Sequence, residues 1–138
     1  IKYLVHLLGD MHCPTHVYYY PDNMTLGKFP IKLHGVETNY HKIWDGQLLD
    51  SRHKFWGFQD YRHALDNYTD EEIARMTEGT PVEWFEESAR RCREIYDWVQ
   101  PGDELGQEFY NAHAPFAEYQ LVLSGYRLAK VLNALFDR

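Results

Sequence analysis

Residues 1–16, IKYLVHLLGDMHCPTH, contain the features that decide both the fold class and the candidate site. Apolar residues occur on nearly every side of residues 1–12, which predicts a buried helix. Pro14 should end that helix near Cys13, because the residue before a proline disfavours the helical backbone region. His6 and Asp10 are four residues apart, so both side chains would project from one face of this helix.

Asp10 is the most informative of these residues, because an isolated charge in so apolar a helix would be very costly. A hydrogen-bonded histidine or a divalent ion would satisfy it. His16 follows just past the helix end, and the His41–Asp45 pair repeats the four-residue spacing. Two histidines and one aspartate are a plausible three-ligand zinc set with an open position. The same ligand types also suit manganese or iron. The candidate metal ligands are His6, Asp10, His16, His41 and Asp45.

The rest of the chain also has mainly helical patterns. Residues 14–37 predict one long loop, with short extended pieces at 17–20 and 31–33. Capping-box residues at Thr69 and Thr80 open two helices, of which the first ends at Gly79 and the second near Val99. Further helices are expected over 39–51, 54–68, 104–112 and 115–136. The sequence therefore predicts a single all-α domain over 1–138, a multi-helix bundle of about six or seven helices with one long loop.

The composition restricts the function classes. A net charge of −7 argues against a basic surface that binds nucleic acid by phosphate contacts, although bound divalent ions would create a local positive centre. Cys13 and Cys92 lie outside any C-x-x-C pattern, so no thiolate zinc site is expected, and two free thiols are favoured over one bridge between them. His12 is not expected to be a ligand, because Pro14 breaks the helix between it and His16. No stretch approaches the roughly 20 apolar residues of a membrane span, so no stable membrane insertion is expected.

Several motifs resemble one known family. Residues 6–16 resemble the H-x-x-G-D-x-H-x-P-x-H motif of the secreted single-strand-specific zinc nucleases and 3'-nucleotidases, which are related to bacterial zinc phospholipase C. Residues 39–45 resemble the N-x-H-x-x-W-D motif of that family. Weaker similarities occur at Glu87-Ser88 after Trp84, and over residues 124–133. The resemblance therefore extends along the whole chain.

The resemblance implies an all-α fold and a cluster of up to three zinc ions. His16, His41 and Asp45 match the complete protein ligand set of one zinc. His6 and Asp10 match two of the four protein ligands of a second zinc, and Asp10 would bridge to the third. The family's other ligands come from an N-terminal half that is not in this chain. Cys13 stands where the family commonly has glutamine, and the 16–41 loop lacks the usual Gly-Gly-Asn.

The implied activity is zinc-dependent hydrolysis of phosphodiesters by a metal-activated water. The implied substrates are single-stranded DNA or RNA and 3'-nucleotides, and the implied location is secreted or periplasmic. Two alternatives stay open: a phospholipase C-like hydrolase of lipid head groups, and an inactive helical fragment that binds one zinc. The chain begins at Ile1 without an initiator Met, which indicates a processed or truncated product whose missing N-terminal segment would be a partner.

Overall fold

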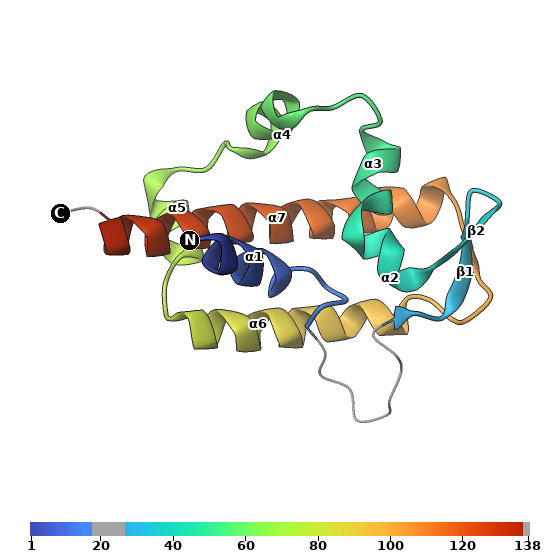
Figure 1. The fold of residues 1–138 in the computed structure, drawn as a ribbon. Coiled ribbons are helices and arrows are strands. Elements are labelled where there is room, and N and C mark those ends of the chain that lie inside the picture. The colour runs from blue at the N-terminus through green and yellow to red at the C-terminus, as the bar shows by residue number, and fades with distance from the viewer. Residues whose placement is uncertain (18–26, 137–138) are drawn as a thin grey trace.

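A computed structural model describes residues 1–17 and 27–136, and helices form most of them (Figure 1). The predominantly helical class predicted from the sequence is confirmed. A small sheet, which the all-α prediction did not include, adds to it. The expected extended piece at 17–20 lies mainly outside the described residues. The elements are α1 (Lys2–Asp10), β1 (Pro30–Leu33), β2 (Val36–Asn39), α2 (Tyr40–Lys42), η2 (Ile43–Gln47), α3 (Leu48–Arg52), α4 (Phe58–Leu65), α5 (Asp70–Met76), α6 (Pro81–Arg93), η3 (Glu94–Asp97), β3 (Glu104–Leu105) and α7 (Gln107–Phe136).

Helix α7 is the longest element and runs across the molecule, with α1, α3 and α5 packed along it (Figure 1). The sequence predicted two helices here, separated before Pro115, and this prediction is wrong. Proline removes one helical hydrogen bond and crowds the carbonyl four residues earlier. The helix continues because Tyr110, Ala114 and Ala117 are buried on both sides of the proline, so packing outweighs the lost bond.

The sheet has the strand order β2-β1-β3. Strands β1 and β2 form an antiparallel hairpin in which Leu33 faces Val36, and β3 pairs with β1 in parallel. His34 and Gly35 have positive φ values of 50° and 79°, so the two-residue turn matches the right-handed twist of the hairpin. The sheet closes one end of the molecule, where it leads directly into α2.

The segment from α2 to α3 supplies much of the core. Tyr40, Ile43 and Leu48 are fully buried, and the Tyr40 hydroxyl donates to the Ile95 carbonyl at 2.6 Å. The Asn39 side chain accepts from the Lys42 amide and so begins this helical segment. The sequence predicted one helix over 39–51, whereas the structure has α2, the π-helical turn η2 and α3 in succession. The prediction therefore located the element but not its irregular centre.

Helix α1 forms where it was predicted, but the prediction that it is buried is wrong. Leu8 is its buried residue, with 3% of its surface exposed, while Tyr3 and Leu7 are 83% and 62% exposed. The physical reason is that α1 packs on α7 by one side only. The helix has apolar residues on several sides, so its pattern does not indicate which side is covered.

The helix expected over 54–68 is shorter than predicted, because local caps set its limits. The Gly57 amide donates to the Asp60 carboxylate at the start of α4, and the Asn67 side chain donates to the His63 and Ala64 carbonyls at its end. Phe58, the first residue of α4, is 76% exposed. Within the described residues, no helix is long and apolar enough to cross a membrane.

Candidate metal centre

Helix α1 holds His6 and Asp10 in the geometry that their spacing predicts. His6 Nε2 lies 3.3 Å from Asp10 Oδ2. The Asp10 side chain is 42% exposed, so the burial argument that drew attention to it does not apply. Its pairing is nevertheless observed, because its second oxygen lies 3.4 Å from His16 Nδ1. One carboxylate therefore joins a histidine of the helix to a histidine of the loop.

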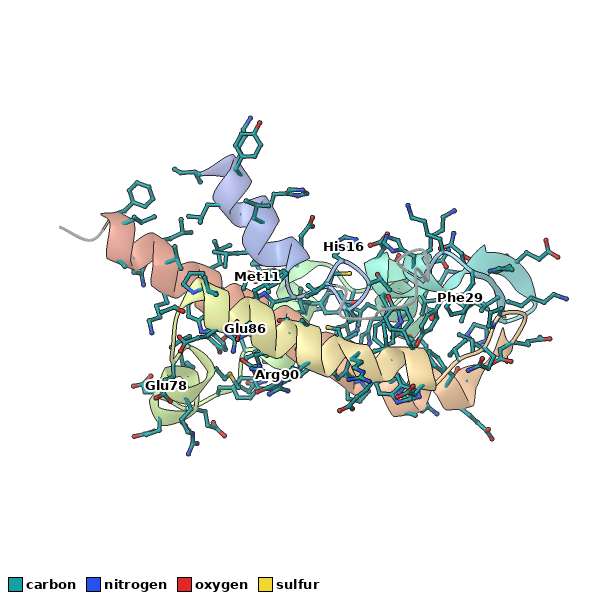
Figure 2. All side chains as sticks on the ribbon, turned by 90° about the horizontal axis from the view of Figure 1, so that it is seen from below. Met11, His16, Phe29, Glu78, Glu86 and Arg90 are labelled. Atoms are coloured by element: carbon teal, nitrogen blue, oxygen red, sulfur yellow. The ribbon has the colours of Figure 1, made fainter. Side chains whose placement is uncertain are left out.

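A series of backbone turns brings His16 back toward α1. The amides of His12, Cys13 and His16 donate to the carbonyls of Gly9, Asp10 and Cys13, each at 3.0 Å. Figure 2 shows His16 beyond Met11, at the end of the turns that follow α1. These tight turns keep His16 within reach of both carboxylates.

The second pair comes from the helical segment after the hairpin. His41 Nε2 lies 3.3 Å from Asp45 Oδ2, and Asp45 Oδ1 lies 2.8 Å from His16 Nε2. The rings of His16 and His41 are 5.1 Å apart between centroids. The structure therefore brings all five candidate ligands into one continuous series of contacts. Along this series the order is His6, Asp10, His16, Asp45 and His41.

The spacing of the donor atoms suits metal ions bound between them. Nitrogen and oxygen ligands lie about 2.0–2.2 Å from zinc, so two ligands in a tetrahedral arrangement are about 3.4 Å apart. Three of the four contacts, at 3.3, 3.4 and 3.3 Å, have this separation. The fourth, at 2.8 Å between His16 and Asp45, has the length of a hydrogen bond. The residues present thus fit a zinc centre by chemistry and by distance.

The sequence did not identify Cys13 as part of this centre. Three side chains, Cys13, His16 and Asp45, each offer a donor atom, and these atoms lie within 4.8 Å of one another. This group differs from the expected set of His16, His41 and Asp45. Burial is the largest influence on the thiol and raises its pKa. In the sequence, the feature that could have indicated this role is the position of Cys13 inside the first motif, residues 6–16. Both cysteines are free thiols, as expected.

His12, which was set aside as a ligand, is buried against α7. Its Nδ1–H donates to the Leu8 carbonyl at 2.7 Å, which leaves Nε2 to accept from Arg127 Nη1 at 3.0 Å. Burial is the main reason why the pKa of His12 is lowered. The lowered pKa favours the neutral ring, which can donate through Nδ1 and accept through Nε2. The Gln120 side chain also donates to the His12 carbonyl, at 3.1 Å. Helix α7 therefore anchors the segment between Asp10 and His16.

A groove of about 470 Å³ adjoins the centre. Asp10 and His16 lie at its polar edge, and its remaining surface is mainly apolar. Two of the apolar side chains, Val82 and Phe85, come from α6 and are exposed. The groove is lined by Leu7, Asp10, Met11, His16, Val17, Pro81, Val82 and Phe85.

Comparisons with known proteins identify the family of this chain. The S1/P1 nuclease family model matches residues 1–137. The chain is 27% identical over 159 residues to Endonuclease 2 of Arabidopsis thaliana, and the match covers 99% of this chain and 51% of that protein. It is 25% identical over 155 residues to Endonuclease 1 of the same plant, with 99% and 49% covered. The chain spans about half the length of the curated relatives it matches. By this match over nearly all its residues, the chain belongs to the S1/P1 nuclease family.

Proposed function

We propose that this chain carries part of the zinc centre of a phosphodiesterase that hydrolyses single-stranded nucleic acid and 3'-nucleotides. The observation that supports the proposal is the continuous series of contacts from His6 to His41. Imidazole and carboxylate groups alternate along it, so neighbouring ions could share a carboxylate. Names of the relatives, endonucleases of Arabidopsis thaliana, support the nuclease class.

The side chains of the centre have separable roles in this proposal. Asp10 and Asp45 each present two oxygens to different histidines, so each carboxylate can hold an ion and orient a ring. His16 lies between them and fixes the separation of the two halves of the centre. When bound, zinc would supply an activated water as nucleophile and offset the negative charge of the phosphate.

The local charge also bears on the substrate. The chain has a formal charge of −7, which disfavours a polyanion at long range. Divalent ions at the centre would reverse the charge there and attract a phosphate. Single strands fit such a site better than duplexes, because their bases are free to stack on exposed aromatic side chains.

We also propose that a segment of a longer protein completes the centre as an intramolecular partner. Two observations support it. The chain spans about half the length of its relatives. Leu7 of α1 exposes apolar surface beside Asp10 and His16, and Phe85 adds to this surface in the same groove. Such a segment would supply the ligands beyond these five. A secreted or periplasmic location is part of the proposal and rests on family membership.

Metal analysis and substrate assays test the proposal. The 138-residue chain and the product of the complete reading frame are each loaded with zinc and analysed for metal content. Each is then given single-stranded DNA, a 3'-nucleotide and phosphatidylcholine. We expect the complete protein to hydrolyse the first two, to lose activity with a chelator and to recover it with zinc. The variant His41→Ala should lose this activity, and His63→Ala, at an exposed histidine of α4, should keep it.

Other outcomes point to the alternatives. Cleavage of phosphatidylcholine without cleavage of nucleic acid would replace the nuclease proposal with a phospholipase C-like activity. Zinc binding by the complete protein with no hydrolysis of any of the three substrates would identify a zinc-binding helical module instead. Full activity in His41→Ala would show that the assigned centre is not the active one.

A further inference from the structure

The turns after α1 carry Cys13 to the centre together with His16. Its Sγ lies 3.9 Å from Asp45 Oδ1, the same oxygen that lies 2.8 Å from His16 Nε2. Sulfur, nitrogen and oxygen donors therefore converge from two segments that are about 30 residues apart in the sequence. The neighbouring His41 contacts the other oxygen of Asp45. Three side chains, Cys13, His16 and His41, thus surround the Asp45 carboxylate.

The sulfur is held in this place by buried surroundings. The thiol donates to the Trp44 carbonyl at 3.7 Å, and Thr15 Oγ1 lies at the same distance. Thr15 is fully buried and Trp44 nearly so. The contacts of Cys13 thus come from the same two segments that carry His16 and Asp45, and they leave its sulfur directed toward the carboxylate.

The observed separation is close to that of two ligands on one ion. Zinc–sulfur bonds are about 2.3 Å long and zinc–oxygen bonds about 2.0–2.2 Å, so tetrahedral ligands of these types lie about 3.5 Å apart. The Sγ to Oδ1 distance of 3.9 Å needs only a small closure. The donor atoms of three side chains, Cys13, His16 and Asp45, already lie within 4.8 Å of one another.

We propose that the Cys13 thiolate is the fourth protein ligand of the ion bound by His16, His41 and Asp45. The proposal rests on the proposed function, since it needs a metal at this centre. On binding, the S–H bond breaks, its proton passes to solvent, and a metal–sulfur bond forms. One thiolate and one carboxylate then balance the charge of a divalent ion.

With this ligand set, the two halves of the centre would have different roles. Four protein ligands close a tetrahedral site and leave no position for substrate, whereas a catalytic zinc keeps one open. The open position would then lie on the side of His6 and Asp10. A thiolate also favours softer ions, so this site should prefer cadmium to zinc more strongly than a site of histidine and aspartate alone.

Cobalt(II) substitution tests the sulfur ligand directly. A cobalt–thiolate bond gives an intense near-ultraviolet charge-transfer band, and tetrahedral cobalt gives weaker visible bands whatever its ligands. Cys92→Ser is the matched control, because it leaves Cys13 as the only thiol of a chain that has two cysteines. We expect the near-ultraviolet band in the unmodified chain and in Cys92→Ser. The band should disappear in Cys13→Ser while the visible bands remain, and the preference for cadmium over zinc should fall in that variant alone.

The two kinds of band separate the possible failures. Visible bands without the near-ultraviolet band in the unmodified chain and in Cys92→Ser would overturn the role of Cys13 and leave the metal centre in place. The absence of both kinds of band would overturn the metal centre and the sulfur ligand together. If Cys13→Ser does not fold, the spectrum of Cys92→Ser still decides, because only Cys13 could give its near-ultraviolet band.

Discussion

Asp45 lies between two histidines, His16 and His41, and contacts each with a different oxygen. Asn would keep the size of the side chain but remove its charge and one acceptor oxygen. Since outer-shell substitutions alone weaken metal binding about 10–100-fold, we expect Asp45→Asn to weaken zinc binding by more than about 100-fold. Competition with a chromophoric chelator measures this. Asp50→Asn, an exposed aspartate on α3, should leave the affinity unchanged, and an equal loss in both variants would contradict the assignment.

The ionisation of Glu87 should contribute to the way in which the free energy of unfolding changes with acid. Partial burial would raise its pKa, but the hydrogen bonds and charges of Arg127 and Arg91 lower it overall below 4.5. The folded protein therefore releases this proton more readily than the unfolded chain. The stabilisation is complete above pH 4.5 and is lost as the pH falls through the lower folded value.

We therefore expect the free energy of unfolding to fall more steeply with acid in the natural chain than in Glu87→Gln. Denaturant titrations followed by circular dichroism across this pH range measure the slope. Glu86→Gln, at the neighbouring exposed position, serves as the control and should keep the natural slope. Equal slopes in Glu87→Gln and the natural chain would show that this carboxylate is not coupled to folding.

Among the elements, α7 is linked through Arg127 to α5, to α6 and to the turn after α1. This nearly fully buried side chain donates to the Met76 carbonyl and to His12, contacts the Glu87 carboxylate, and lies over the Trp84 ring. Lysine cannot reproduce the planar fork of donors. We expect Arg127→Lys to lower the free energy of unfolding by about 3 kcal/mol.

The control for Arg127→Lys is Arg90→Lys, at an exposed i,i+4 pair on α6. It should change the free energy of unfolding by less than about 0.5 kcal/mol, because isolated surface pairs contribute little. Chemical denaturation measures both variants. Similar small effects in the two would mean that the buried network does not stabilise the packing of these helices.

The orientation of α1 can be tested with two adjacent leucines. Leu8 is 3% exposed against α7 and Leu7 is 62% exposed. We expect Leu8→Ala to cost about 2–5 kcal/mol of unfolding free energy, as for a buried leucine, and Leu7→Ala to cost less than about 1 kcal/mol. Thermal and chemical unfolding of the 138-residue chain measure the difference. A larger cost for Leu7→Ala would mean that the helix presents another side to α7.

For the whole molecule, metal binding should couple to folding. The centre joins the turn after α1 to the segment that begins at α2, which are distant in the sequence. An ion that binds only this folded arrangement stabilises it by about 2.7 kcal/mol at 100 times its dissociation constant. We expect zinc to raise the midpoint of thermal unfolding and a chelator to lower it, as followed by calorimetry. A midpoint of thermal unfolding that does not change with zinc would contradict the proposed metal centre.

The local features of this protein were predictable from its sequence. The Thr69 and Thr80 capping boxes form as expected, each with its hydroxyl accepting from the amide three residues later. The His6–Asp10 and His41–Asp45 pairs also meet, because residues four apart on a helix lie on one face. Covalent geometry over one or two turns determines such contacts, so no knowledge of the rest of the fold is needed.

The tertiary structure alone decided the contacts between distant segments. It brought Cys13 to Asp45, buried His12 against Arg127, continued α7 through Pro115 and left Leu7 exposed beside the buried Leu8. Each depends on which surfaces pack together, and packing is not encoded in the spacing of neighbouring residues. The sequence by itself therefore determined the mainly helical class, the capping boxes and the two His–Asp pairs. Only the packing of distant segments brought these pairs together through His16 and placed the Cys13 sulfur beside Asp45.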